Sequence, residues 1–296
     1  MHNLKLATPK TCVLAAFVIL SASVAQAQYT AVWYDGYATS ANSSDVNFEY
    51  TTRQGGALGA ISYAQNPAAG DFHHQVNNGG APNKLLLAGD GGSLGMVSPN
   101  FNFNSLVGGG APSLVFFQLQ MNVFDLAPYT TAGFSLGSSS TLTGAQDATT
   151  HFGIRFTRDA LFGGGNVMQF FDGNTQVGGN YSFPGGIDPG ASSFDVSLTI
   201  ADLSDSNPWN GVGSTDIGVS VNGSLVGSYS KGGGGYTDNF MTLESGFGAT
   251  PGPVVGLGVN VFDELTVFVS PVPEPSTFAL AALGLGGLLS FRRRKA

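Results

Sequence analysis

The chain has 296 residues and a formal net charge of −8; charged residues make up only 10 % of it and hydrophobic residues 42 %. Its single cysteine, Cys12, lies near the N-terminus, which excludes disulfides, thiolate metal sites and a cysteine nucleophile from the rest of the chain. The 44 glycines have no fixed period, which favours many turns and excludes collagen and long helices.

The first 27 residues have the three parts of a secretory signal peptide. Two lysines precede an apolar stretch at residues 12–20, and Ala25 and Ala27 supply the small side chains of an Ala-x-Ala cleavage site. The apolar stretch is too short for a membrane anchor, because a span needs about 20 residues. We therefore predict that signal peptidase cuts after Ala27 and leaves Gln28 as the mature N-terminus.

The body, residues 28–271, alternates apolar and polar residues with the period of β-strands. The clearest alternation lies at residues 115–123, 152–156, 194–200 and 261–269. Asn222-Gly223 stands between two further alternating segments and is a strong hairpin signal. No stretch of a dozen residues has an apolar face at helical spacing. These patterns predict one all-β domain, a single antiparallel β-sandwich of jelly-roll type.

The expected body is strongly acidic. It contains 18 Asp or Glu and five Lys or Arg, which gives a net charge of −13 and should repel nucleic acid and anionic membrane surfaces. The oxygen-rich segments 172–174 and 202–207 could hold calcium, which takes six to eight oxygen ligands. Asp and Asn also favour turns for backbone reasons alone. We predict no cofactor and leave calcium open.

Residues 272–296 form a tail with three physically different parts. Pro273, Glu274 and Pro275 hold the backbone extended and prevent a helix. The apolar residues 278–291 could form a helix about 21 Å long, which is short for a full span of the bilayer. The chain then ends in cations that prefer the cytoplasmic side and would stop translocation: Arg292, Arg293, Arg294 and Lys295.

This tail resembles the PEP-CTERM sorting signal in its Val-Pro-Glu-Pro-Ser-Thr segment, its Gly-bearing apolar stretch and its Arg cluster. The resemblance implies that a membrane-embedded exosortase recognises residues 273–275 and cuts near them. It also implies that residues 278–291 anchor the chain transiently in the inner membrane while the body lies outside. The alternative is an ordinary tail anchor without cleavage, which leaves the Pro-Glu-Pro element unexplained.

The C-terminal half of the body has a second resemblance, to concanavalin A-like (laminin-G-like) jelly rolls. It rests on residues 216–229 and 237–243 and on residues 260–267, which contain the closing pattern Phe262-Asp-Glu-Leu-Thr-Val. Domains of this kind often bind glycans, sometimes with calcium. Because fold does not determine function, the resemblance implies the fold more than the activity.

The sequence contains no convincing catalytic constellation. Two Gly-x-Ser-x-Gly matches precede no plausible helix. His73 and His74 are adjacent, so on a strand they point to opposite faces, and the same holds for Asp263 and Glu264. The Glu-x-Asp-x-x-Glu run of sandwich-fold glucanases is absent. We therefore predict that the protein is not an enzyme.

Aromatic residues in loop or edge positions could stack on sugar rings: Trp33, Trp209, Tyr181 and Tyr236, with Trp209 the best candidate. The function predicted from these features is that of an exported, non-enzymatic protein of the cell envelope or extracellular matrix. It would act structurally or through weak contact with polysaccharide. A dedicated carbohydrate-binding module is the first alternative, and a secreted polysaccharide hydrolase is the second.

Overall fold

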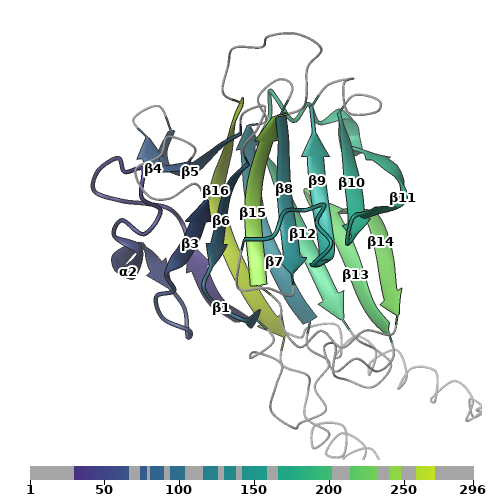
Figure 1. Cartoon of the computed structure of the whole chain (residues 1–296), viewed down its shortest axis with the longest axis horizontal. Coiled ribbons are helices and arrows are strands. Elements are labelled where there is room, and N and C mark those ends of the chain that lie inside the picture. The colour runs from purple at the N-terminus through teal and green to yellow at the C-terminus, as the bar shows by residue number, and fades with distance from the viewer. Residues whose placement is uncertain are drawn as a thin grey trace, which may run out of the picture.

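The structure is a computed structural model in which two antiparallel β-sheets lie face to face (Figure 1). It describes residues 30–66, 74–78, 81–89, 94–103, 116–125, 130–137, 142–158, 166–201, 214–232, 240–247 and 258–270. Within these ranges, helix is confined to the short turns α2 (Tyr50–Arg53) and η3 (Pro184–Gly186). The prediction of an all-β antiparallel body is therefore confirmed.

Sheet A, the rear layer in Figure 1, contains nine strands. Its main path is, in spatial order, β14 (Ser224–Gly232), β13 (Ser214–Val221), β12 (Phe194–Ala201), β7 (Phe116–Asp125), β16 (Gly258–Ser270), β1 (Thr30–Asp35) and β2 (Gln54–Gly55). Two further strands join beside β16: β5 (Ala81–Gly89) and its partner β4 (His74–Asn78).

Sheet B, the front layer in Figure 1, contains seven strands. Their spatial order is β11 (Thr175–Ser182), β10 (Val167–Asp172), β9 (Thr150–Thr157), β8 (Thr130–Gly137), β15 (Phe240–Phe247), β6 (Gly95–Pro99) and β3 (Tyr63–Asn66). Among its crossings, the chain passes from sheet A to sheet B between β7 and β8 and from sheet B to sheet A between β15 and β16. Because β7 lies beside β16 and β8 beside β15, the two crossings are neighbours, as in a jelly roll.

The alternation found in the sequence corresponds to real strands. The described part of each of the four alternating segments lies in one strand, namely β7, β9, β12 or β16. Asn222 and Gly223 form the tight turn between β13 and β14 with φ values of 47° and 75°, the left-handed backbone that such hairpins require. The strands β1 to β6 were not predicted, because their sequences alternate weakly.

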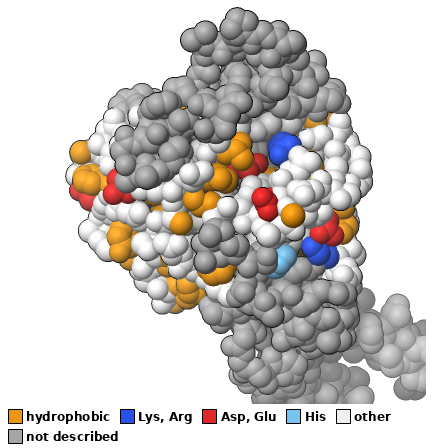
Figure 2. Space-filling model, in the orientation of Figure 1, with side chains coloured by type: hydrophobic (Ala, Val, Ile, Leu, Met, Phe, Trp, Pro, Cys, Tyr) orange, Lys and Arg blue, Asp and Glu red, His pale blue; other side chains and the backbone are white. Residues whose placement is uncertain are grey.

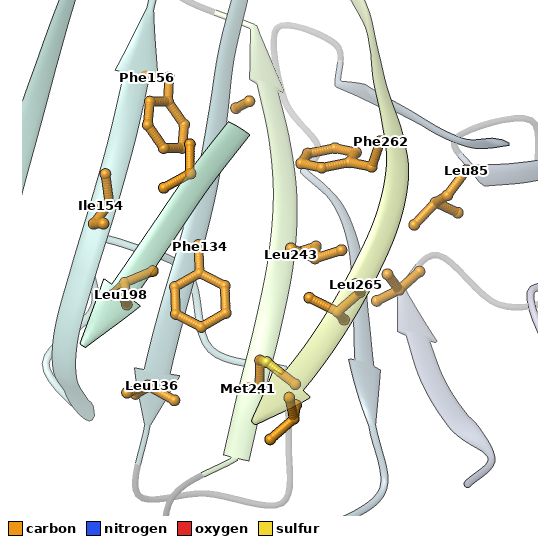
Figure 3. Packing of buried hydrophobic residues seen from close by; sticks show 14 of the residues in the cluster. Leu85, Phe134, Leu136, Ile154, Phe156, Leu198, Met241, Leu243, Phe262 and Leu265 are labelled. Carbon is orange, nitrogen blue, oxygen red and sulfur yellow. The ribbon is translucent and has the colours of Figure 1, made fainter. Parts of the chain in front are cut away.

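The hydrophobic core lies between the sheets, as Figure 3 shows. Phe134 and Ile154 of sheet B and Leu198 and Leu265 of sheet A point into this layer and are fully buried. Fully burying a side chain of this size contributes about 1.5–3 kcal/mol relative to leaving it exposed. The inward face of each sheet is thus apolar, which leaves the two outward faces to carry polar chemistry.

A buried ion pair holds the segment between β1 and β3 against the sandwich. The side chains of Asp35 and Arg53 are 0 % exposed, and Arg53 Nε lies 3.0 Å from Asp35 Oδ1. Tyr63 Oη and Gln54 Nε2 also donate to Asp35 Oδ2, at 2.8 and 2.9 Å. The remaining Arg53 nitrogens donate to two backbone carbonyls. The Asp35 carboxylate therefore connects β1 to β2, to β3 and to the turn α2 through its hydrogen bonds.

Among the described residues, no helix is long and apolar enough to cross a membrane. The predicted signal peptide, with Ala25 and Ala27, and the predicted tail helix at residues 278–291 both lie outside the described residues. They stay predictions from the sequence.

Candidate functional site

One line of residues crosses the outer face of sheet B at right angles to the strands. Glu244 of β15 is paired with Met96 of β6 and with Gly133 of β8. Gly133 is paired with Arg155 of β9, and Arg155 with Gln169 of β10. We call Glu244, Gly133, Arg155 and Gln169 the polar row. Because cross-strand partners in register lie about 5 Å apart on one face, the register brings these residues together from distant parts of the sequence.

Because Gly133 has no side chain, the Glu244 side chain can lie over β8, between its own strand and Arg155. A Cβ at position 133 would lie only 2.7 Å from Glu244 Cδ, so the glutamate side chain occupies the space that a side chain of β8 would need. The carboxylate therefore leans along the row toward Arg155. A larger residue at position 133 would force it away from the sheet.

A strap, residues 142–149, lies across this face in front of the sheet (Figure 1). The Ala145 amide donates to Glu244 Oε2 at 2.9 Å, and Ser135 Oγ donates to the carbonyl of Thr143 at 2.5 Å. Thr143 and Ala145 are buried. The strap therefore covers the glutamate end of the polar row.

Burial shifts the pKa of Glu244. Desolvation raises the pKa of this carboxyl above its ordinary value of 4.5, and the nearby charge of Asp147 acts in the same direction. The positive charge of Arg155 and the hydrogen bond from the Ala145 amide oppose the shift without cancelling it. Glu244 is only 2 % exposed, so it clamps the strap and is closed to an external ligand.

Arg155 connects the covered end of the row to its open end. Its Nη1 donates to Gln146 Oε1 of the strap at 2.8 Å, and its guanidinium carbon lies 5.0 Å from the centre of the Phe171 ring. Its Nε is buried and has no hydrogen-bond partner among the described residues. The guanidinium thus lies over the Phe171 ring, between the strap and β10.

Three mutually bonded amides form the open end of the face, and we call them the amide cluster: Gln169, Gln176 and Asn180. Gln169 Nε2 and Gln176 Nε2 each donate to Asn180 Oδ1 at 3.0 Å, and Gln169 Nε2 lies 3.2 Å from Gln176 Oε1. All three bonds are solvent-exposed. Each amide carries two N–H donors and one carbonyl acceptor, which suits partners that both donate and accept, such as sugar hydroxyls.

A bulge in β11 positions Asn180 in this cluster. Three residues of β11, 178–180, lie opposite Gln169 alone, between the pairs Met168–Tyr181 and Phe170–Val177. Gly178 adopts a φ of 71°, and a Cβ there would lie 2.5 Å from the Tyr181 hydroxyl. Bulges that re-aim a side chain are frequent beside functional sites.

Figure 2 shows this face of the molecule as mostly uncharged, with a few acidic and basic side chains near its centre. The contacts divide the outer face of sheet B into two regions. The covered end is Glu244 under the strap, and the open end is the amide cluster beside Arg155. The chemistry available to a ligand at the open end is therefore hydrogen bonding by amides and one guanidinium.

The structure describes only two of the aromatic candidates. Tyr181 lies on the inner side of the edge strand β11, where its ring stacks on Phe170 at a centroid distance of 4.5 Å. Trp33 is fully buried, and its Nε1 donates to Gln54 Oε1 at 3.3 Å. Trp209 and Tyr236 lie outside the described residues, as do the proposed sorting residues 273–275 and 292–295. Their predicted roles stay predictions.

The remaining candidates are separated in space or occupied. The carboxylate of Asp172, in one of the oxygen-rich turns, accepts from Lys231 at 2.5 Å and from the Tyr229 hydroxyl at 2.6 Å. Asp263 pairs with Lys84, whereas its neighbour Glu264 accepts from Thr266. Over the described part of the chain, no group of three or more His, Cys, Asp or Glu could hold a metal ion.

The C-terminal tail of the chain matches a known protein-sorting motif. Residues 271–295 match the model of the PEP-CTERM protein-sorting motif. The chain carries a PEP-CTERM sorting motif. This motif implies export, transit through the membrane and processing by an exosortase, and it confirms the resemblance of the tail. No curated protein matches the chain.

Solved structures similar to the chain share little sequence with it. A LamA variant from Zobellia galactanivorans in complex with laminaritriose and laminaritetraose is 12 % identical, with a TM-score of 0.48 over 81 % of this chain and 98 % of that one. An alginate lyase Aly36B mutant in complex with alginate trisaccharide is 11 % identical, with a TM-score of 0.42 over 72 % and 88 %. The Emp47p carbohydrate recognition domain is 11 % identical, with a TM-score of 0.40 over 70 % and 87 %. Because these scores lie below 0.5, we base the function on the chain's own residues.

The amide cluster was not predicted from the sequence. Gln and Asn in a strand look like ordinary solvent-facing residues, and only the register of β10 with β11, including the bulge, brings them together. The one local signal is Gly178-Gly179-Asn180, which interrupts the strand pattern and could have indicated a bulge.

Proposed function

We propose that the mature protein is an exported, non-enzymatic β-sandwich of the cell surface or extracellular matrix that binds neutral polysaccharide through the amide cluster. The observation that carries the proposal is the set of hydrogen bonds among Gln169, Gln176 and Asn180 on an exposed face. These bonds hold the amides in place before a ligand arrives, which reduces the entropy lost on binding.

The charge of the chain supports a neutral ligand. The body, residues 28–271, with its net charge of −13, would repel an anionic polysaccharide at long range. The cation nearest the cluster, Arg155, already interacts with the Gln146 amide and the Phe171 ring. Hydroxyl groups without charge are the partners that the three amides fit best.

The state of Glu244 supports a non-enzymatic role. Most glycosidases need two carboxyl groups that flank the scissile bond and reach the substrate. Glu244 lies under the strap with one oxygen bonded to the Ala145 amide. The exposed amide cluster itself contains no carboxylate and no nucleophile.

The test is binding of the exported protein to immobilised neutral and anionic polysaccharides. We expect retention on at least one neutral polysaccharide and none on anionic ones. Replacing Gln169 and Asn180 together by Ala should weaken retention about 10- to 100-fold, since each lost hydrogen bond contributes about 0.5–1.5 kcal/mol.

Ser214→Ala is the matched control, because Ser214 is a half-buried polar residue on the other sheet. It should bind like the wild type. Equal retention of the double variant, or release of sugar from any polysaccharide, would contradict the proposal.

A further inference from the structure

The outer face of sheet A has a row of its own. Seven neighbouring strands each contribute one residue to a line of successive cross-strand partners. In spatial order the line is Gly55, Tyr34, Thr266, Gln120, Ser197, Ser220 and Leu225. Tyr34 and Leu225 are exposed to 43 % and 70 %, whereas most large apolar side chains of the described strands are buried. The two exposed apolar residues thus stand toward opposite ends of a single line, about 24 Å apart at the usual strand spacing.

Tyr34 is held flat against the sheet. A Cβ on its cross-strand partner Gly55 would lie 2.5 Å from Tyr34 Cζ and 2.6 Å from Cε1, so the phenol ring occupies the space that a side chain at position 55 would take. One ring face therefore lies on the backbone of β2 while the residue keeps 43 % of its surface exposed. A flat, exposed aromatic ring is a platform for the apolar face of a sugar ring.

Hydroxyl residues occupy three of the four positions between the two apolar ends, and Gln120 occupies the fourth. Ser197 and Ser220 are half-buried and face each other across β12 and β13. Thr266 lies beside Tyr34 but is only 5 % exposed, and its hydroxyl donates to Glu264 Oε1 at 2.8 Å, so the exposed part of the line is Tyr34, Ser197, Ser220 and Leu225. No position of the line carries a charged residue. We call the exposed or half-buried residues of this line, Tyr34, Ser197, Ser220 and Leu225, the hydroxyl row.

We propose that the hydroxyl row binds a second neutral polysaccharide chain, which runs across the strands with one sugar ring on Tyr34. This inference rests on the proposed function, since it adds a glycan site on the opposite face of the same sandwich. With one site on each outer face, a single molecule would bridge two polysaccharide chains.

A second copy of the chain fits this face less well than a sugar chain. Two copies of the body, with a net charge of −13 each, repel one another. The exposed apolar surface is two separate side chains and not a continuous patch, whereas a stable protein interface buries about 1,200–2,000 Å² in total. A thin line of hydroxyls with apolar ends matches a single extended chain of sugars.

The experiment compares binding with bridging for the full exported protein. Binding is measured on immobilised neutral polysaccharide, and bridging by light scattering when the protein is added to the same polysaccharide in solution. Tyr34→Ala removes the ring, and Gly55→Val keeps the ring but displaces it. We expect both variants to stay bound through the amide cluster and to lose scattering at least tenfold. Leu94→Ala, which changes an apolar residue of similar exposure away from the hydroxyl row, should scatter like the wild type.

The outcomes separate the two proposals. If both Tyr34→Ala and Gly55→Val scatter like the wild type while the Gln169/Asn180 variant loses binding, the hydroxyl row is not a site and the proposed function stands. If the wild type binds no neutral polysaccharide, the proposed function itself fails. If the protein alone forms dimers that Tyr34→Ala dissolves, a second copy occupies the face and the inference is overturned. Unchanged unfolding midpoints of the variants show that the fold is intact.

Discussion

Replacing Asp35 by Asn should lower the free energy of unfolding by about 3–5 kcal/mol, because it leaves the buried guanidinium of Arg53 without its counter-charge. Both side chains are 0 % exposed, so water cannot replace the lost charge. Tyr63 and Gln54 now donate to the Asp35 carboxylate. In the variant they would donate to an uncharged amide oxygen, which is a weaker acceptor. Urea unfolding measures the effect as a lower midpoint.

The matched control is the exposed pair between Lys84 and Asp263. Its nitrogen and oxygen lie 2.8 Å apart, but Asp263 is 39 % exposed. Exposed pairs contribute about 0–1 kcal/mol, so Asp263→Asn should barely move the midpoint. If Asp35→Asn and Asp263→Asn have the same small effect, the Asp35–Arg53 pair does not hold the segment between β1 and β3.

Gly153→Ala should be the second large effect, with a loss of about 1–3 kcal/mol from overpacking. A Cβ at position 153 would overlap the carbonyl oxygen of Ala145 and lie 2.7 and 2.9 Å from its carbonyl carbon and Cα. These are backbone atoms, so the strap must lift from the sheet. Lifting it removes the amide that now donates to the buried Glu244 carboxylate. Hydrogen exchange of the Ala145 amide should accelerate along with the loss of stability.

Gly179→Ala controls for the general effect of replacing a strand glycine. Gly179 is exposed on β11, and a Cβ there would meet nothing within 4 Å. The change in stability should stay within about 0.5 kcal/mol. Protection of the Ala145 amide that persists in Gly153→Ala would mean that the strap does not rest on Gly153.

Local patterns predicted the strands whose two faces differ most. In β9, Phe152, Ile154 and Phe156 point inward and are at most 1 % exposed, as their alternation indicates. The turn at Asn222 was predictable for a similar reason, since its left-handed backbone requires particular residues. Such signals depend only on neighbours in sequence.

Features that depend on register could not be predicted in this way. Phe262 and Leu265 of β16 are both fully buried although they are three residues apart, because the pairing with β7 shifts between them. A strict alternation would place them on opposite faces. The same limit hid Asn180, which reaches Gln169 only because three residues of β11, 178–180, lie opposite that single residue of β10.

The two outer faces illustrate why the sites were harder to predict than the fold. The hydroxyl row joins Tyr34 to Ser220, and the polar row joins Arg155 to Glu244, across large separations in sequence. Candidate glycan contacts were sought among aromatic residues, whereas the exposed aromatic ring of sheet A depends on a glycine in the neighbouring strand, Gly55. That dependence becomes visible only after the strands are paired.

The intact mass of the form found outside the cell tests the central claim most directly, because every role proposed for the two faces requires that the body be delivered there. We predict a chain that begins at Gln28 and ends near Pro273, without the apolar stretch and the basic end, as processing of the motif at residues 271–295 implies. A cell-surface form whose mass still includes the tail through Ala296 would contradict this account.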